Sequence, residues 1–344
     1  MKGARVLLIA MGVLIALSLW APVQAADQVW TTPQKITTSS AWSRGGPVVY
    51  GDKVYYNERR SVSNPVEIWV WDQAGGARLY MGGPDYLNVN AWAVYQDRVL
   101  FTRYANNQYG LYVHDPLTGD RLISATAGDF SNSPMASMYG DMVTWTDVRS
   151  GVKQVYTWDP VNGERHVNPT SYDQMNPRIW GNKVVYEDYR YVEDPRYGGG
   201  DPDIWTWNPL NGSQQLASGM TNPVIYRDDI YALKPGSDGW PPYTVSELWR
   251  FGPRGGRLAT STGAPSGAWG DLVVTDGLSW DPVHGLIHMS SIGGTQYSLY
   301  GRQAAWVNNN DIYVSTFVPE PGGLCSLSVL LAGACLSLRR RRRA

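Results

Sequence analysis

Short stretches in which apolar and polar positions alternate recur along the chain, each beside a turn. Lys53-Val54-Tyr55-Tyr56 is one such stretch, and Met142-Val143-Thr144-Trp145 and Lys183-Val184-Val185-Tyr186 repeat its pattern. A period of two in segments rich in β-branched and aromatic residues predicts β-strands. We therefore expect a protein built from many short antiparallel strands.

A dipeptide of the Gly-Asp type recurs at a regular interval. Its copies are Gly51-Asp52, Gln96-Asp97, Gly140-Asp141, Gly181-Asn182, Arg227-Asp228, Gly270-Asp271 and the degenerate Gly301-Arg302. Their spacings are 45, 44, 41, 46, 43 and 31 residues, close to the period of about 40–45 residues of a four-stranded propeller blade. We expect each copy to form the tight hairpin between the first and second strands of a blade.

A second signature follows in most units, an aromatic-rich strand that ends in Asp-Pro or a relative of it. Examples are Tyr156-Thr157-Trp158-Asp159-Pro160 and Trp205-Thr206-Trp207-Asn208-Pro209. A glycine two or three residues later predicts another tight turn into a fourth strand. Each unit therefore contains four antiparallel strands.

The seventh unit ends without a fourth strand, while an unassigned strand, residues 33–38, precedes the first unit. If this segment completes the last blade, the two open sheet edges disappear. Residues 26–316 then supply about 42 residues for each of seven blades. The sequence thus predicts an all-β, seven-bladed propeller over residues 26–317, with six or eight blades as the alternatives.

The N-terminal 25 residues have the organisation of a secretory signal peptide. Lys2 and Arg5 precede an apolar run from Val6 to Trp20, and small residues lead to a cleavage site between Ala25 and Ala26. A retained membrane helix is the alternative, but the apolar run is short and ends before Pro22. We expect residues 1–25 to be removed on export.

The C-terminal segment, residues 318–344, has three features in order. Pro319-Glu320-Pro321 is followed by the uncharged residues 322–338 and then by the cluster Arg339–Arg343. Such a stretch can span a bilayer with its arginines on the cytoplasmic side, as an ordinary membrane anchor would. The ordered set resembles the PEP-CTERM sorting signal of exported proteins in Gram-negative bacteria.

The PEP-CTERM resemblance implies partners and a location. It implies export by the secretion machinery, transient anchoring in the inner membrane by the C-terminal helix, and cleavage near Pro319-Glu320-Pro321 by an exosortase. The final location would be the cell envelope, the outer surface or the extracellular matrix.

Charge and cysteine content limit the partners and the stabilising bonds that the protein can have. The chain has a formal net charge of −1, but residues 26–318 hold 22 basic and 29 acidic side chains. A nucleic-acid partner is not expected, because it would require a basic surface. Both cysteines, Cys325 and Cys335, lie in the C-terminal segment, so the propeller contains no disulfide.

One repeat carries a second resemblance. Val184-Val185-Tyr186, followed by Asp188 and Arg190 and then by Asp203-Ile204-Trp205, is similar to the propeller repeats of TolB-like and prokaryotic cell-surface proteins. The resemblance covers nearly the whole body. It implies the fold and only loosely a role, because propellers host enzymes and binding modules alike.

The loops between second and third strands vary in length and lie on one face of a propeller, hereafter the variable-loop face. Blades four and five have the long ones, within residues 188–203 and 234–243. Aromatic rings stack on sugars, and carboxylates bind their hydroxyls. The predicted sugar-binding residues are Tyr191, Tyr197, Trp240, Tyr243, Asp188 and Asp194. The alternative is that these are solvated turns whose aromatics cover a blade edge.

No catalytic constellation is visible in the sequence. The four histidines map to outer strands or to a short turn, and the acids near blade four do not match a calcium loop. We expect no metal and no cofactor. The recurring acid-x-Arg triplets, such as Asp147 with Arg149, suggest structural ion pairs between blades.

The sequence therefore predicts an exported, non-catalytic propeller that binds a glycan, such as an exopolysaccharide, or a surface protein. A carbohydrate-active hydrolase or lyase on the same scaffold is the alternative, because acids from different blades can converge in space.

Overall fold

The computed structural model describes residues 30–38, 40–83, 89–105, 108–125, 135–190, 201–236, 246–261, 263–275, 277–289 and 294–318. The chain divides into two compact units, residues 32–316 and a unit that joins residues 1–31 to 317–344. In the second unit, the rings of Trp30 and Phe317 meet edge to face at 5.5 Å. Among the described residues, no helix is long and apolar enough to cross a membrane.

The predicted cleavage and sorting residues all lie outside the described ranges. These are Ala25, Ala26, Pro319, Glu320 and Pro321. The division into residues 1–25, 26–317 and 318–344 therefore stays a prediction.

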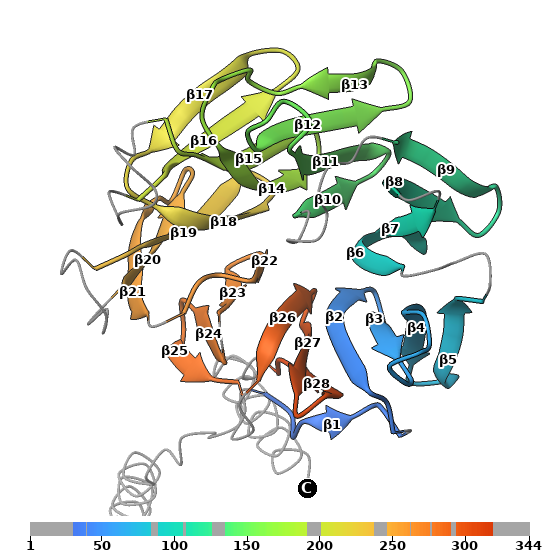
Figure 1. Cartoon of the computed structure of the whole chain (residues 1–344). Helices are drawn as coiled ribbons and strands as arrows, with labels where there is room; N and C mark the ends of the chain where they lie inside the picture. Colours follow the sequence, from blue (N-terminus) through green and yellow to red (C-terminus); the bar gives the residue numbers. More distant parts are fainter. Residues whose placement is uncertain are drawn as a thin grey trace, which may run out of the picture. The chain divides into compact units, whose positions relative to one another are not determined.

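Residues 32–316 form seven four-stranded antiparallel sheets, arranged as the blades of a propeller around a common axis (Figure 1). Propeller blades surround a central channel along this axis. Blades one to three are β2 (Ser43–Tyr50), β3 (Lys53–Arg59), β4 (Glu67–Asp72), β5 (Gly76–Met81); β6 (Asn90–Tyr95), β7 (Arg98–Ala105), β8 (Gln108–Asp115), β9 (Gly119–Ser124); and β10 (Ala136–Tyr139), β11 (Met142–Asp147), β12 (Gln154–Asp159), β13 (Gly163–His166). Blades four and five are β14 (Gln174–Trp180), β15 (Lys183–Asp188), β16 (Asp203–Asn208), β17 (Gly212–Ala217); and β18 (Thr221–Tyr226), β19 (Asp229–Lys234), β20 (Ser246–Phe251), β21 (Gly256–Ser261). Blades six and seven are β22 (Gly267–Trp269), β23 (Leu272–Val274), β24 (Leu278–Asp281), β25 (Gly285–His288); and β26 (Thr295–Tyr300), β27 (Gln303–Asn308), β28 (Asp311–Thr316), β1 (Gln34–Lys35).

The seven-bladed prediction is confirmed, and the turn signatures explain the blades. The first residue of each Gly-Asp type turn has a positive φ, between 51° and 63°, which the primed hairpin turns require and glycine adopts without strain. In the Asp-Pro turns the aspartate side chain caps the turn. Asp159 Oδ1, for example, accepts a hydrogen bond from the backbone N–H of Val161 at 3.0 Å.

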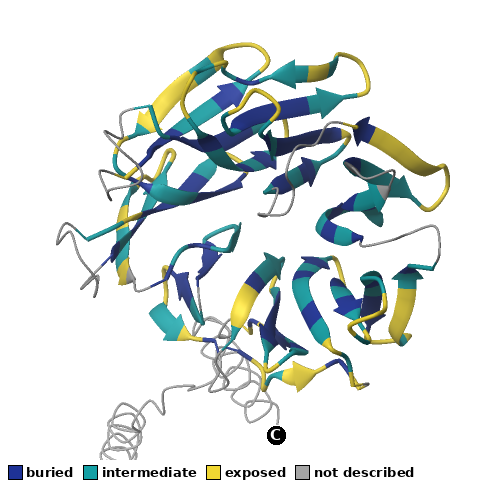
Figure 2. Cartoon of the chain, in the orientation of Figure 1, coloured by how far each residue is buried: buried dark blue, intermediate teal, exposed yellow. Residues whose placement is uncertain are grey.

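Burial is greatest at the second strand of a blade and falls toward the outer edge. The second strands are the most buried, as in β11 and β15, whereas fourth strands such as β9 and β17 are largely exposed (Figure 2). Apolar clusters fill the spaces between neighbouring blades. Among the described residues, Trp145 and Trp306 are the largest fully buried side chains.

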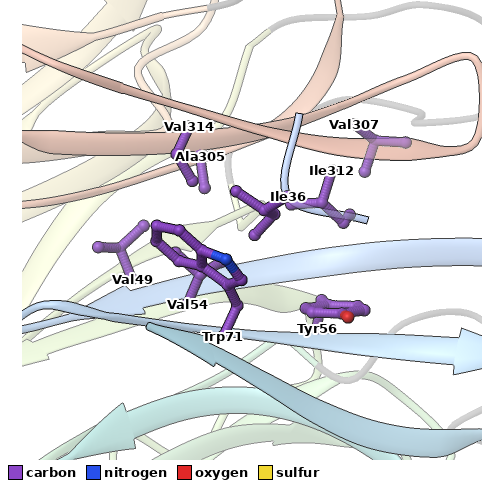
Figure 3. Packing of buried hydrophobic residues seen from close by; sticks show 9 residues of the cluster. All are labelled: Ile36, Val49, Val54, Tyr56, Trp71, Ala305, Val307, Ile312 and Val314. Atoms are coloured by element: carbon purple, nitrogen blue, oxygen red, sulfur yellow. The ribbon is translucent and has the colours of Figure 1, made fainter. Parts of the chain in front are cut away.

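An N-terminal strand closes the ring, as predicted, but it is shorter than residues 33–38. β1 pairs with β28 through only Gln34 and Lys35. One further backbone hydrogen bond, from Ile36 N–H to the carbonyl of Ile312 at 3.0 Å, continues the pairing. Ile36 then enters an apolar cluster shared by blades seven and one (Figure 3).

Blade-to-blade ion pairs exist, but they are not formed by the acid-x-Arg triplets. Three of them join the first residue of a second strand to the turn aspartate of the next blade: Lys53 to Asp97 at 2.7 Å, Arg98 to Asp141, and Lys183 to Asp228 at 3.5 Å. The interpretation of the triplets as inter-blade pairs was wrong. Residues two apart at a strand end reach each other more readily than they reach a neighbouring sheet.

Candidate functional site

The variable-loop face has the asymmetry that the sequence predicted. Residues 189–202 of blade four and 235–245 of blade five connect second to third strands, whereas the same connections in the other blades have two to seven residues. Five of the six predicted sugar-binding residues lie outside the described ranges: Tyr191, Asp194, Tyr197, Trp240 and Tyr243. Their role stays a prediction.

Asp188, the sixth, is fully described and is held inside blade four. Its side chain is 0% exposed and accepts hydrogen bonds from Arg190 at 2.7 and 2.8 Å and from Gln174 at 3.0 Å. The carboxylate is therefore saturated by protein donors.

The arginine of each triplet does more than pair with its acid. Arg190 lies over the ring of Trp205 at 4.1 Å, and Arg149 lies over Tyr156 at 4.5 Å. Both aromatics belong to third strands, and such cation–π contacts stabilise a blade edge. The triplets are thus structural, as predicted; their ion pairs lie within one blade, and Arg149 also donates to Ser124 of blade two at 2.9 Å.

The histidines lie where the sequence placed them. His114 is on a third strand, His166 and His288 are on fourth strands, and His284 is in a short turn. Among the described residues, no group of three or more His, Cys, Asp or Glu side chains is placed to hold a metal ion.

A ring of seven aromatic side chains encircles the channel where the first strands end. It consists of Tyr50, Tyr95, Tyr139, Trp180, Tyr226, Trp269 and Tyr300, hereafter the aromatic collar. Neighbouring ring centroids lie 4.2–5.5 Å apart around the complete circle. The ring centroids of Trp180 and Trp269, which are the two neighbours of Tyr226 in the collar, also lie 5.9 Å apart.

The orientation of the collar follows from the symmetry of the fold. Successive blades of a seven-bladed ring are rotated by about 51°, and neighbouring collar rings are inclined to each other by 44–56°. The two values agree only if the ring planes stand nearly parallel to the channel axis. Burial raises the pKa of Tyr50, and a hydrogen bond with Tyr300 adds to this shift.

A cavity of about 320 Å³ adjoins the collar inside the channel. Its walls are the last two or three residues of the first strands, together with Arg178 and Arg227. No carboxylate is among these lining residues. The cavity therefore combines aromatic rings with positive charge.

Sequence reasoning missed the collar, although its signal was present. All seven rings immediately precede the turn dipeptide, at the same position of every repeat. The position was interpreted only as part of an apolar strand. The convergence becomes evident when the seven first strands are placed around one axis.

No protein-family model and no curated protein matches this chain. Among solved structures, oligogalacturonate lyase from Vibrio parahaemolyticus is 10% identical, with a TM-score of 0.57 over 84% of this chain and 94% of that one. The β-propeller domain of the Trilobed protease from Pyrococcus furiosus is 11% identical, with a TM-score of 0.56 over 80% and 95% of the two chains.

TolB from Acinetobacter baumannii is 12% identical, with a TM-score of 0.45. The alignment covers 78% of this chain, which spans 65% of the length of TolB. At such identities the similarities show the fold alone. The chain is a seven-bladed β-propeller of four-stranded blades.

Proposed function

We propose that this chain is an exported propeller that binds a glycan or a surface protein through its variable-loop face and catalyses no reaction. The observation that carries the proposal is the length of two adjacent loops. Only blades four and five extend the connection between second and third strands, to 14 and 11 residues. Loops placed by a rigid scaffold are the usual location of binding residues.

The cavity at the collar end of the channel supports binding there over catalysis. A carboxylate pair would suit a glycosidase, whereas the lining of this cavity contains aromatic, aliphatic and basic side chains and no acid. A carbohydrate-active hydrolase or lyase is the second candidate, because the fold is similar to that of oligogalacturonate lyase.

The terminal segments carry the proposed route. Residues 1–25 direct export, and the Pro319-Glu320-Pro321 segment is cut by an exosortase after transient anchoring in the inner membrane. The processed propeller then resides at the envelope, the outer surface or the extracellular matrix.

A glycan array with the purified propeller, run beside a hydrolysis screen, tests the function. For a glycan that binds, Trp240→Ala should weaken affinity by about 1–3 kcal/mol, the loss typical of a stacked aromatic. Trp42→Ala is the matched control, since Trp42 is 56% exposed in blade one. Equal affinity of the folded Trp240 variant and the wild type would contradict the site, and product release in the screen would favour the enzyme.

The sorting proposal has a separate test. Replacing Pro319, Glu320 and Pro321 with alanine should leave export intact and trap an uncleaved membrane species, because the signal peptide is unchanged. Mass spectrometry of the envelope fraction reads the C-terminus. The same processed mass from mutant and wild type would refute cleavage at this motif.

A further inference from the structure

The cavity beside the aromatic collar is a second place at which this protein can hold a ligand. Its volume of about 320 Å³ falls at the lower end of the range for small-molecule pockets. It lies inside the channel and contains none of the predicted sugar-binding residues of blades four and five. This site and the proposed function are therefore independent of each other.

Charge at the cavity is opposite in sign to that of the propeller as a whole. Residues 26–318 carry a net charge of −7, whereas the charged residues of the lining are Arg178 and Arg227. An anionic ligand is the one that such a cavity favours.

Arg178 has no carboxylate in hydrogen-bond contact among the described residues. It donates to the carbonyl of Pro177 at 3.2 Å, and burial lowers the pKa of its guanidinium, while the charge of Glu187 acts in the opposite direction. The oxygens of Glu187 are already occupied. Oε1 accepts from Asn222 N–H at 2.6 Å, and Oε2 accepts from the Asn176 side chain at 2.6 Å and from the Tyr189 hydroxyl at 3.1 Å.

The channel wall also suits a ligand with several hydroxyl groups. Every first strand is the edge strand of its sheet, so one row of backbone N–H and C=O groups is not used by the ladder. Serine hydroxyls satisfy part of this row, since Ser298 Oγ accepts from Val49 N–H at 3.0 Å. The remaining groups provide donors and acceptors around the cavity.

We infer that the channel binds a sugar acid of monosaccharide size. Arg178 binds the carboxylate, the aromatic collar supports the ring, and the inner backbone edges bind the hydroxyls. A neutral sugar lacks the charge for Arg178, and a small carboxylate such as acetate lacks the ring and hydroxyl contacts.

Calorimetric titration of the propeller with D-glucuronate, D-glucose and acetate tests the inference. D-glucuronate should bind saturably, at least tenfold more tightly than either of the other two. Arg178→Met should weaken D-glucuronate binding at least tenfold, and Arg178→Lys, which keeps the charge, should recover part of the loss. Lys183→Met is the matched control: it removes one positive charge from the same blade outside the cavity lining, and should leave affinity unchanged.

Three results would overturn the site. The first is no binding of D-glucuronate by the wild type, and the second is equal affinity for D-glucose. The third is unchanged D-glucuronate affinity in a folded Arg178→Met variant, with folding checked by the melting temperature. A glycan that binds on the array but is unaffected by Arg178→Met would leave the variable-loop proposal standing while this one failed.

Discussion

The seam between blades one and two and the seam between blades seven and one join equivalent sheets, but the ion pairs that cross these seams lie at opposite ends. At the first seam, Asp97 lies in a short turn, where it accepts from Lys53 at 2.7 Å and from the Tyr55 hydroxyl at 2.8 Å. At the closing seam, the ion pair between the blades lies on the variable-loop side. Arg44 donates there to Glu58 at 2.7 Å and to Asp311 at 3.0 Å.

The difference reflects how the chain runs through each seam. The chain passes directly from β5 of blade one to β6 of blade two, and an apolar cluster also joins these blades. Blade seven is completed only by the two-residue strand β1, which has few backbone bonds to hold it. The side chains of Lys35 and Thr37 also contact Asp311, at 2.6 and 2.8 Å. Asp311, the first residue of β28, therefore binds the N-terminal segment to blade seven.

Removing β1 should have the largest effect. A propeller that begins at residue 39 loses the pairing with β28, the burial of Ile36 and the contacts to Asp311. It should lose several kcal/mol of its free energy of unfolding, a large share of typical protein stability. Urea unfolding measures this against a propeller that begins at Pro33 and retains β1. Identical midpoints for the two would show that closure does not depend on this strand.

A matched pair of substitutions compares the seams directly. Arg44→Met should cost about 3–5 kcal/mol, because it removes the buried arginine that donates to the carboxylate of Glu58 and leaves only the more distant Arg60, at 3.9 Å, among its ion-pair partners in the described residues. Both side chains of that pair are 2% exposed. Lys53→Met at the first seam should cost less than about 1 kcal/mol, since that pair is partly solvated. Equal losses in urea unfolding would mean that burial does not distinguish the seams.

These seams also mark how far the sequence could predict the structure. The blades were predictable because each turn signature is local, as with Gly140-Asp141 and the capping aspartate Asp159. The closing contacts were not, since Arg44 and Asp311 are 267 residues apart and no local pattern links them. The collar is intermediate: its position within the repeat is local, but its function as a ring depends on closure. The aromatics of blades four and five stay predictions.

Lowering the pH should destabilise both seams, and this effect should be smaller than those of removing β1 and of replacing Arg44. Burial by itself would raise the pKa of Asp311, but hydrogen bonds from Lys35 and Thr37 outweigh it, and the pKa is lowered. The pKa of Asp97 is also lowered, by Lys53 and the Tyr55 hydroxyl, against the effect of burial. A carboxyl whose pKa is lower in the folded state contributes stability above its unfolded pKa of about 3.9, and this stability is lost as the pH falls through the folded value.

Asp311→Asn should therefore flatten the decline of unfolding free energy as the pH falls below about 4. Asp97→Asn should do the same at the other seam, and above that pH each variant should be less stable than the wild type. Urea unfolding at a series of pH values provides the comparison. If the unfolding free energy of the Asp311 variant falls with pH as steeply as that of the wild type, Lys35 and Thr37 do not hold this carboxylate ionised. The apolar contacts of Ile36 then dominate the closing seam.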